Sequence, residues 1–502
     1  MVDRTLTYRQ RIQALALAAE NTLGPPIVSD ACRTALDDGV IGDLHEGSFP
    51  HRPRYTLPDY ARALTLGSDF LELASPSDFD DATTLLLALY GSVPSITGYP
   101  VWFGDLDRLL EPFAADLTDA ELHHRLRRFW ILLDRLFPDA FAHANLGPED
   151  GRVARAALAV HREVRQVVPN LTLRVDPRTT PDGLLLDAVR TIAVVAQPHL
   201  VNHPIMVADL GERYGVVSCY NSLPVGGGAH TLVRLDLKQA AVRHTGDAGS
   251  FAATTLATYV DLTAELMIAR IRRLIEESGF FESSWLVREG LLSLDRFTAM
   301  FGLIGLAECV ETLLEHDGRP GRYGHDRHAD ELAHAIVRSV AARVADIPVP
   351  YCEATGGRAL LHSQAGLESD RGVTAGTRVA VGSEPPLYDH VRVVAPNHAL
   401  FPSGVSDIMR LDETIADNPQ AGVDIARGAM AAGMRDVTFE VAGGEFVRVT
   451  GFLVRRCDLD RIDDGVRHAS TVLGAGQFTN MHLDERRVQR VRSHELDPRS
   501  GR

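Results

Sequence analysis

The sequence predicts an α/β protein with a large core. From residue 170 onward, short apolar runs bounded by Pro and Gly alternate with amphipathic helical segments, a pattern typical of strands alternating with helices. The residues before 170 are mainly helical in pattern. A chain of 502 residues, 45% of them hydrophobic, has room for about three domains or for one large barrel.

Helix signals dominate the first third of the chain. Thr118 and Glu121 have the spacing of a capping box, and the helix that they begin is expected to end before Pro138. A second helix is predicted over 152–168, because its Val and Ala residues recur on one face. The uncharged run over 82–104 contains Gly and Pro residues, which favour a buried helix followed by turns over a membrane span.

The middle and the end of the chain supply the predicted strands. Four apolar runs are interpreted as strands, at 171–175, 191–195, 216–218 and 231–237. A helix is predicted over 256–275. After a Gly- and Pro-rich connection, Asn418 and Pro419 are expected to start a helix, and β-rich sequence follows over 437–454.

Composition excludes several classes of function. The 51 basic and 67 acidic residues give a net charge of −16, which argues against a main role in binding nucleic acid or anionic membranes. The cysteines are few, odd in number and widely spaced: Cys32, Cys219, Cys309, Cys352 and Cys457. This spacing indicates a reduced, cytoplasmic chain without a disulfide framework, and the charged N-terminus shows no signal-peptide pattern.

A glycine interrupts the strongly β-prone run Phe446–Val454. Glycine weakens a strand, so it marks a bulge, a tight turn or a place where something approaches the backbone closely. The segment from Arg448 to Phe452, R-V-T-G-F, resembles the R-V-x-G-[FY] motif of glycyl radical enzymes, whose glycine near the C-terminus stores an unpaired electron. A planar Cα radical is stabilised by the flanking amide and carbonyl, and a side chain would twist it. The resemblance implies that Gly451 holds the radical.

Cys219 is the candidate partner of this glycine. It follows a short apolar strand and precedes a Pro- and Gly-rich turn and a second strand from Thr231, which predicts a thiol at the tip of a finger-like hairpin. The same family carries its thiyl-forming cysteine on such a finger. Without the glycine motif, a lone cysteine would be interpreted as a small buried hydrophobe.

Other segments extend the resemblance over most of the chain from about residue 170. F-G-L-I-G-L-A-E-C at 301–309 resembles a helix-opening segment of the family, and 170–177 and 202–206 resemble barrel strands that precede the cysteine. The S-C-Y-N finger with its triple glycine is most similar to the YjjI-type branch. The resemblance implies a ten-stranded α/β barrel of two five-stranded halves. We therefore expect three parts: an N-terminal helical part packed on the barrel (1–169), the barrel core with the cysteine finger (170–385) and a C-terminal glycyl radical unit (386–502).

The sequence also departs from the well-known members of this superfamily. Pyruvate formate-lyases use two adjacent cysteines, dehydratases place Glu two residues after the cysteine, and anaerobic ribonucleotide reductases add a four-cysteine zinc site. Here Cys219 has no cysteine neighbour, and Asn221 occupies the position of that Glu. Asn221 and His203 are candidates to orient a substrate hydroxyl or carbonyl, although each is also a plausible structural hydrogen-bonding residue.

The resemblance implies an oxygen-sensitive enzyme of anaerobic metabolism. A separate radical-SAM activase, an Fe–S enzyme, would install the radical on Gly451, with no cofactor bound to this chain. Cys219 would then act as a transient thiyl on a small polar organic substrate, in a lyase or rearrangement reaction. The family resemblance also favours a homodimer.

Competing interpretations stay open at this level. Gly226–Gly228 lacks the ending of a P-loop, so a flexible turn is the expected structure. His325, His328 and His334 would support a metal-dependent hydrolase, but their spacing is not H-E-x-x-H. A catalytically inactive barrel that acts as a binding or scaffold protein is the other alternative.

Overall fold

A computed structural model provides the structure of the chain. It describes residues 11–12, 15, 18–19, 22, 24–43, 46–48, 50–93, 102–136, 142–218, 220–363, 372–448, 453–460 and 486–489. Cys219 and Gly451, the two residues predicted to carry the radical, therefore lie outside the described residues, whereas their near neighbours on both sides are described.

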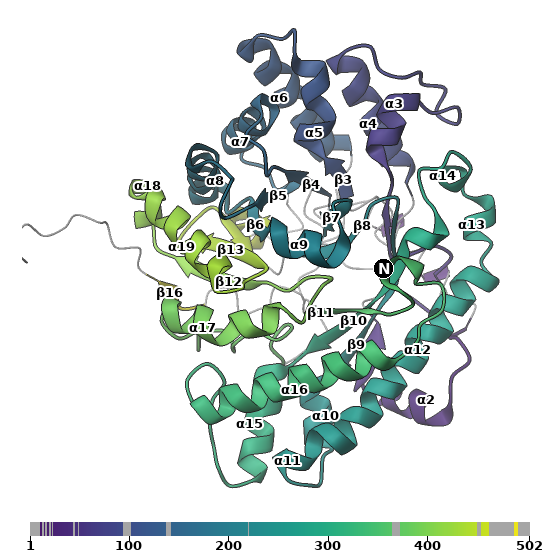
Figure 1. Cartoon of the computed structure of the whole chain (residues 1–502), viewed down its shortest axis with the longest axis vertical. Helices are drawn as coiled ribbons and strands as arrows, with labels where there is room; N and C mark the ends of the chain where they lie inside the picture. The colour runs from purple at the N-terminus through teal and green to yellow at the C-terminus, as the bar shows by residue number, and fades with distance from the viewer. Residues whose placement is uncertain are drawn as a thin grey trace, which may run out of the picture.

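Strands occupy the centre of the molecule and helices surround them (Figure 1). The larger sheet has seven strands in the order β16-β12-β13-β6-β5-β4-β3. Its strands are β3 (Trp102–Asp105), β4 (His143–Leu146), β5 (Asn170–Val175), β6 (His199–Asn202), β12 (Asp407–Leu411), β13 (Asp436–Val441) and β16 (Val488–Gln489). β3 to β6 are mutually parallel, as are β12, β13 and β16, and β13 is antiparallel to β6. Two parallel halves thus meet at the β6–β13 pair.

A second sheet and two small hairpins complete the described strands. The second sheet contains β1 (Ile41–Asp43), β2 (Tyr55–Leu57), β9 (Gly227–Asp236), β10 (Phe297–Ile304) and β11 (Leu360–Ser363). β9, β10 and β11 are parallel, and β1 and β2 run antiparallel to β9. One hairpin pairs β7 (Tyr214–Val217) with β8 (Asn221–Pro224), and the other pairs β14 (Phe446–Arg448) with β15 (Leu453–Arg455).

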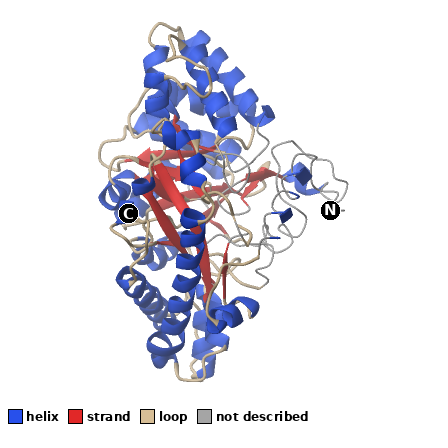
Figure 2. Ribbon diagram, turned by 90° about the vertical axis from the view of Figure 1, so that its right-hand side faces the viewer, coloured by secondary structure: helices blue, strands red, loops and turns tan. Residues whose placement is uncertain are grey.

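Helices cover the outside of the sheets, as the perpendicular view also shows (Figure 2). In chain order they are α2 (Asp30–Asp37), α3 (Tyr60–Leu66), α4 (Phe79–Ser92), α5 (Leu106–Leu110), α6 (Asp119–Leu136), α7 (Arg152–Val164), α8 (Asp182–Val195), α9 (His203–Leu210), α10 (Leu237–Val242), α11 (Ala248–Phe251), α12 (Ala257–Glu276), α13 (Phe280–Ser283), α14 (Trp285–Arg288), α15 (Leu306–His316), α16 (Arg327–Asp346), α17 (Leu387–His398), α18 (Thr414–Asp417), α19 (Pro419–Ala431) and α20 (Arg456–Asp460). The predicted α/β class is therefore confirmed.

The predicted local signals act mostly as expected. The Thr118 backbone N–H donates to Glu121 Oε2 at 2.9 Å, and the Glu121 N–H donates to Thr118 Oγ1 at 3.3 Å, so the capping box is formed at the start of α6. Pro419 is the first residue of α19, as predicted. The second predicted helix, α7, ends at Val164, four residues earlier than expected.

One predicted strand is wrong. Residues 191–195 form the last turns of helix α8 rather than a strand. The run is apolar because Thr191, Ile192 and Val195 complete the buried face that Leu184 and Leu185 begin, at helical spacing. A short apolar run fits a buried strand or a buried helix equally well, and here the helix forms.

The core places the β7–β8 hairpin inside the molecule. Most buried apolar residues form one continuous cluster across both sheets and the helices. A smaller cluster joins Val201 of β6 and Met206 of α9 to Tyr214 and Val216 of the hairpin. Strands from all three predicted parts of the chain enter the larger sheet, and the division into three parts stays a prediction. Within the described residues, every helix is too short or too polar to cross a membrane.

Candidate functional site

The predicted finger is a hairpin in its described residues. β7 and β8 pair antiparallel, with Val217 opposite Asn221, so that residues 218–220 connect the two strands, and Ser218 and Tyr220 of this connection are described. Ser218 has a φ of +55°, a left-handed conformation that is uncommon for residues other than glycine. The Asn221 side chain donates from Nδ2 to the Val217 carbonyl at 3.0 Å and reinforces this turn.

Side chains of the larger sheet hold the first strand of the hairpin. Asn145 on β4 bonds both backbone groups of Val216: its Nδ2 donates to the carbonyl at 2.9 Å, and its Oδ1 accepts the N–H at 2.9 Å. Trp102 donates its indole N–H to the same Oδ1 at 3.0 Å. A Cβ at Gly215 would lie 2.6 Å from the Trp102 ring, so glycine permits this close approach. The first strand of the hairpin is thus bonded to β4 at Val216 and packed against Trp102 of β3 at Gly215.

Two side chains bond the carbonyl group of Ser218, the residue before Cys219 in the sequence. The Ser218 carbonyl accepts hydrogen bonds from His143 Nδ1 at 2.8 Å and from Asn170 Nδ2 at 3.1 Å. Because a carbonyl only accepts, His143 carries its proton on Nδ1, and its Nε2 accepts from Thr172 Oγ1 at 2.6 Å. Burial lowers the pKa of His143 to about 3, so the ring is neutral near pH 7.

The residue that follows Cys219 is also firmly packed. The Tyr220 ring lies edge-to-face against His199, with ring centroids 5.0 Å apart, and the Arg378 guanidinium lies 5.9 Å from its centroid. A Cβ at Gly404 would lie 1.8 Å from the Tyr220 carbonyl oxygen, so only glycine allows the backbone contact found there. The Ser222 N–H donates to the Ser403 carbonyl at 2.9 Å. The turn is therefore held between β6 and the segment that precedes β12.

Arg448, the first residue of the glycine motif, is completely buried. Its Nη1 donates to His199 Nε2 at 3.1 Å, and its Nε donates to the Phe439 carbonyl at 3.3 Å. The Arg448 N–H donates to Glu440 Oε2 at 3.2 Å. Since Arg448 lies opposite Leu453 in the β14–β15 hairpin, this anchoring fixes the described residues on both sides of 449–452.

His199 therefore contacts the neighbours of both predicted radical residues. One edge packs on Tyr220, which follows Cys219, and Nε2 accepts from Arg448, which precedes Gly451 by three positions. Because Arg448 is the donor there, the His199 proton is on Nδ1 and is donated to Thr438 Oγ1 at 2.9 Å. The structure brings together two segments that are more than two hundred residues apart in the sequence.

The two predicted substrate residues differ in position. Asn221 is 1% exposed, and among the described residues its Oδ1 has no hydrogen-bond partner. His203 is the first residue of α9, and its Nδ1 is 2.9 Å from the Tyr214 hydroxyl, at the start of β7. Asn221 thus lies beside the turn that contains Cys219, whereas His203 lies at the opposite end of the hairpin.

The histidines that suggested a metal site contact separate carbonyl groups. His325 Nε2 is 2.6 Å from the Ser383 carbonyl, and His334 Nε2 is 2.8 Å from the Val393 carbonyl. Over the part of the chain that the structure describes, no group of three or more His, Cys, Asp or Glu side chains is arranged to hold a metal ion. Helix α16 begins within this segment, at Arg327.

Several residues of the site escaped the sequence reasoning. His143, Asn170 and His199 are the first residues of β4, β5 and β6, and parallel pairing brings them to one edge of the sheet. The available signal was weak, because each is simply a polar residue at the start of an apolar run. Asp436, the first residue of β13, was also missed, and it is a buried charged residue with 1% of its surface exposed.

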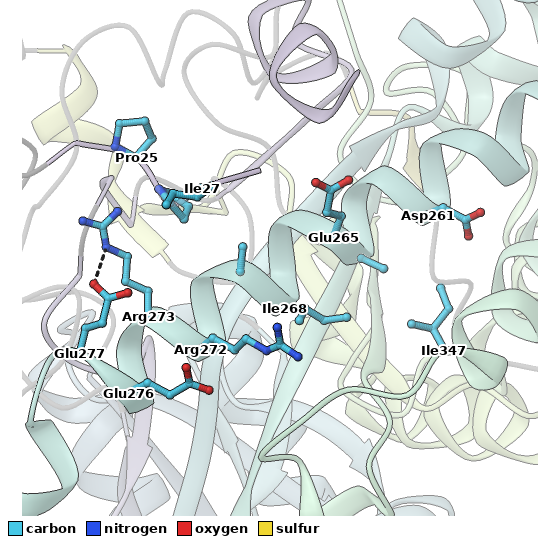
Figure 3. Close-up of a pocket in the computed structure, with 13 residues that line it drawn as sticks. Pro25, Ile27, Asp261, Glu265, Ile268, Arg272, Arg273, Glu276, Glu277 and Ile347 are labelled. Atoms are coloured by element: carbon cyan, nitrogen blue, oxygen red, sulfur yellow. Dashed lines mark ion pairs between the residues drawn. The ribbon is translucent and has the colours of Figure 1, made fainter. Parts of the chain in front are cut away.

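A cavity of about 770 Å³ lies elsewhere on the surface, along the outer face of α12 (Figure 3). Residues 25–27 form its other wall. Two of its charged side chains contact the N-terminal segment: Arg273 Nη1 donates to the Gly24 carbonyl at 3.1 Å, and Glu265 Oε1 accepts the Ser29 N–H at 2.6 Å. These contacts join the N-terminal segment to α12 and involve none of the hairpin residues.

Comparison with known sequences gives relatives of nearly full length. Residues 6–489 match the family model described as "Glycyl radical enzyme YjjI-like". The chain is 46% identical over 496 residues to "Uncharacterized protein YjjI" of Escherichia coli, covering 98% of this chain and 95% of that protein. It is 38% identical over 467 residues to an uncharacterised protein of Haemophilus influenzae, covering 92% and 90% of the two chains.

Solved structures with the same fold are more distant in sequence. The anaerobic ribonucleotide reductase from Thermotoga maritima in complex with dATP and CTP has a TM-score of 0.67 at 12% identity, covering 86% of this chain and 85% of that one. A structure described for 1,2-propanediol dehydration in Roseburia inulinivorans has a TM-score of 0.66 at 11% identity, with coverages of 94% and 84%. This likeness confirms the fold that the glycine motif and the finger predicted. The chain belongs to the YjjI-like family of glycyl radical enzymes.

Proposed function

We propose that Gly451 stores the radical and that Cys219 is the transient thiyl that takes a hydrogen atom from the substrate. The observation that carries this proposal is the shared contact at His199. Tyr220 and Arg448, the described neighbours of the two residues, both contact this one ring. Radical transfer requires the two groups to approach each other, and this arrangement anchors their flanking backbone side by side.

The surroundings of the hairpin turn suit hydrogen-atom transfer better than nucleophilic catalysis. Ser218 and Tyr220 are 4% and 2% exposed, and the neighbouring His143 is neutral. In such surroundings a thiol is expected to keep its proton, because burial disfavours the charged thiolate. An intact S–H bond is the group that hydrogen-atom transfer needs. Exclusion of water by the same packing would protect the radical.

The substrate of the proposed reaction is a small polar organic molecule. The buried Oδ1 of Asn221, which has no hydrogen-bond partner among the described residues, supports a role in accepting a substrate O–H or N–H. His203 is the second candidate for binding the substrate. It is the weaker of the two because it lies at the far end of the hairpin, beside Tyr214. The outcome would be a lyase or rearrangement reaction.

Activation and cellular setting follow from the family. A separate radical-SAM activase would remove hydrogen from Gly451, and this chain itself would bind no cofactor. An oxygen-sensitive enzyme of anaerobic metabolism, cytoplasmic and with a homodimer as its assembly, is the expected setting.

The deciding experiment is anaerobic activation followed by electron paramagnetic resonance. A radical-SAM activase and a reductant are expected to give a doublet signal, split by the one hydrogen left on the glycine Cα. Gly451→Ala should abolish the doublet and Cys219→Ser should retain it. Absence of any organic radical in the wild-type chain would overturn the proposal and favour an inactive barrel that acts by binding.

Exposure to air offers a second check of the radical residue. Oxygen reacts with a backbone radical and cleaves the chain there, so activated protein should lose a C-terminal fragment that begins at Gly451. Denaturing gel electrophoresis and intact mass measurement detect that fragment. An uncut chain, after oxygen has quenched a measured radical, would contradict the assignment of Gly451.

A further inference from the structure

Asp436 is a buried carboxyl group on the inner face of the larger sheet. In the β6–β13 pair, Asp436 lies opposite Val201 and Val437 lies opposite Leu200. Side chains alternate along a strand, so Asp436 and Thr438 point to the same face. Thr438 bonds His199, which packs on Tyr220, and Val201 packs on Val216. The shared face is therefore the one that meets the β7–β8 hairpin.

The described hydrogen bonds of this carboxyl group are all made by one of its two oxygens. Oδ1 accepts from Ser406 Oγ at 2.7 Å and from Thr438 Oγ1 at 2.7 Å. Oδ2 is buried and has no hydrogen-bond partner among the described residues. An unpartnered carboxylate oxygen in a protein interior is costly, and such groups are rare unless a ligand or water completes them. Within the part of the chain that the structure describes, Oδ2 therefore has room in its hydrogen bonding for one further donor.

Residues around Asp436 also contact the hairpin directly. Arg378 donates from Nε to the Ser406 carbonyl at 2.8 Å while its guanidinium lies over the Tyr220 ring. The neighbouring segment packs its Gly404 backbone against the Tyr220 carbonyl. The carboxyl group thus belongs to the same packed unit as the turn that contains Cys219.

The surroundings of Asp436 place the pKa of its carboxyl group near neutral pH. Burial raises its pKa to about 7, against the hydrogen bonds from Ser406 and Thr438 and the positive charges of Arg448 and Arg378. His199 belongs to the same hydrogen-bonded group, because its Nδ1 lies 2.9 Å from Thr438 Oγ1. A carboxyl group with this balance exchanges a proton at physiological pH.

We propose that Asp436 is a catalytic acid–base residue, whose Oδ2 binds a substrate hydroxyl on the carbon that loses its hydrogen atom. The proposal rests on the function proposed above for Gly451 and Cys219. It adds a substrate class, a small molecule with at least one alcohol O–H, and it places the proton-transfer group on β13 rather than on the hairpin.

The proposed step balances without any added oxidant or reductant. The Cys219 sulfur radical takes a hydrogen atom, so one C–H bond breaks, one S–H bond forms, and the unpaired electron moves to carbon. The adjacent O–H is more acidic in that radical than in the parent alcohol, and its proton moves to Oδ2, forming a neutral carboxylic acid. At the end of turnover the acid gives the proton to the product, and the S–H returns its hydrogen atom to the product radical.

Binding of glycerol, the probe for a polyhydroxyl ligand, tests the proposal on the unactivated full-length chain. At pH 8, where Asp436 is ionised, isothermal calorimetry should show affinity for glycerol that Asp436→Asn lowers by about tenfold, the typical effect of losing one hydrogen bond to a charged group. Affinity of the wild-type chain should fall as pH drops below about 7, and that of Asp436→Asn should stay constant.

Glu308→Gln is the matched control. Glu308 also has one bonded oxygen, which accepts from the Thr374 N–H at 2.9 Å, and a buried Oε2 without a partner among the described residues, but it lies at the start of α15. Its variant should bind glycerol as the wild type does. Wild-type affinity in Asp436→Asn, or no measurable binding by the wild-type chain, would overturn the proposal.

The radical signal separates this test from that of the function itself. Asp436→Asn should form the Gly451 doublet at wild-type yield, because Asp436 is not required for activation, and this also shows that the variant is folded. A missing doublet in the wild-type chain would count against the radical chemistry. A variant that forms the doublet but keeps wild-type glycerol affinity would count against Asp436 alone.

Discussion

Asp407 and Asp436 point to opposite faces of one sheet and have different hydrogen-bond partners there. Both begin strands of the larger sheet, β12 and β13, and both are at most 2% exposed. Asp407 points outward to α17, where His390 Nε2 is 3.4 Å from one oxygen and His398 Nε2 is 3.0 Å from the other. Asp436 points inward to the hairpin and has hydroxyl partners on a single oxygen.

The two carboxyl groups are equally buried, so their different hydrogen-bond partners account for the difference between their pKa values. Burial alone would raise the pKa of both carboxyl groups. At Asp407 the hydrogen bonds and charges of the two histidines outweigh burial, and the pKa lies below its ordinary value. At Asp436 two hydroxyl groups do not, and the pKa rises to about 7. The outer aspartate joins a helix to the sheet, whereas the inner one has an oxygen without a hydrogen-bond partner among the described residues.

The largest expected change in stability comes from the outer aspartate. Asp407→Asn removes a buried charge between two histidines and should lower the free energy of unfolding by about 3 to 5 kcal/mol. Because the folded pKa is depressed, this stability is present above the unfolded pKa of about 3.9 and is lost as pH falls through the folded pKa. Denaturant unfolding of the wild-type chain and Asp407→Asn, at pH 8 and in acid, measures both the loss of stability and its pH dependence. If Asp407→Asn has the wild-type unfolding midpoint at pH 8, the difference drawn between Asp407 and Asp436 is wrong.

The inner aspartate should respond in the opposite direction. Its folded pKa is raised to about 7, so its charge lowers stability increasingly as pH rises from about 4 to 7. Asp436→Asn should therefore increase the free energy of unfolding by about 2 to 4 kcal/mol at pH 8, and by much less at pH 5. The same denaturant series tests this, and a loss of stability at pH 8 would show that the carboxylate is better compensated than its contacts indicate.

Gly404 and Gly428 allow the packing beside the hairpin to be compared with the packing of an outer helix. Gly404 has a φ of +120° and touches the Tyr220 backbone, so Gly404→Ala should cost about 2 to 3 kcal/mol and disturb the hairpin turn. Gly428 in α19 has open space around its Cα, and Gly428→Ala should add about 0.5 to 1 kcal/mol through helix propensity. Thermal unfolding of the two variants checks the signs, and similar effects would contradict the packing described for Gly404.

The sequence allowed the local parts of the site to be predicted. The capping box, the hairpin around Cys219 and the glycine motif each depend on residues that are close together in the chain. The run 191–195 shows the limit of such reasoning, because five apolar residues fit a buried strand or a buried helix.

The contacts between distant segments could not be predicted in the same way. His199 meets Thr438 and Arg448 because β6 pairs with β13, and nothing in either strand specifies that partner. The inward direction of Asp436 depends on register as well, since a shift by one residue would point it outward to α17. The sequence therefore predicted two radical residues, Cys219 and Gly451, but not the histidine that contacts their described neighbours.

Hydrogen exchange into the glycyl radical tests the central claim most directly, namely that Cys219 and Gly451 meet. The activated chain is transferred to D2O without oxygen, and its electron paramagnetic resonance signal is followed. If the Cys219 thiol exchanges with solvent and passes deuterium to the Gly451 Cα, the doublet should collapse to a single line in the wild-type chain and persist in Cys219→Ser. A wild-type doublet that persists in D2O would contradict the account.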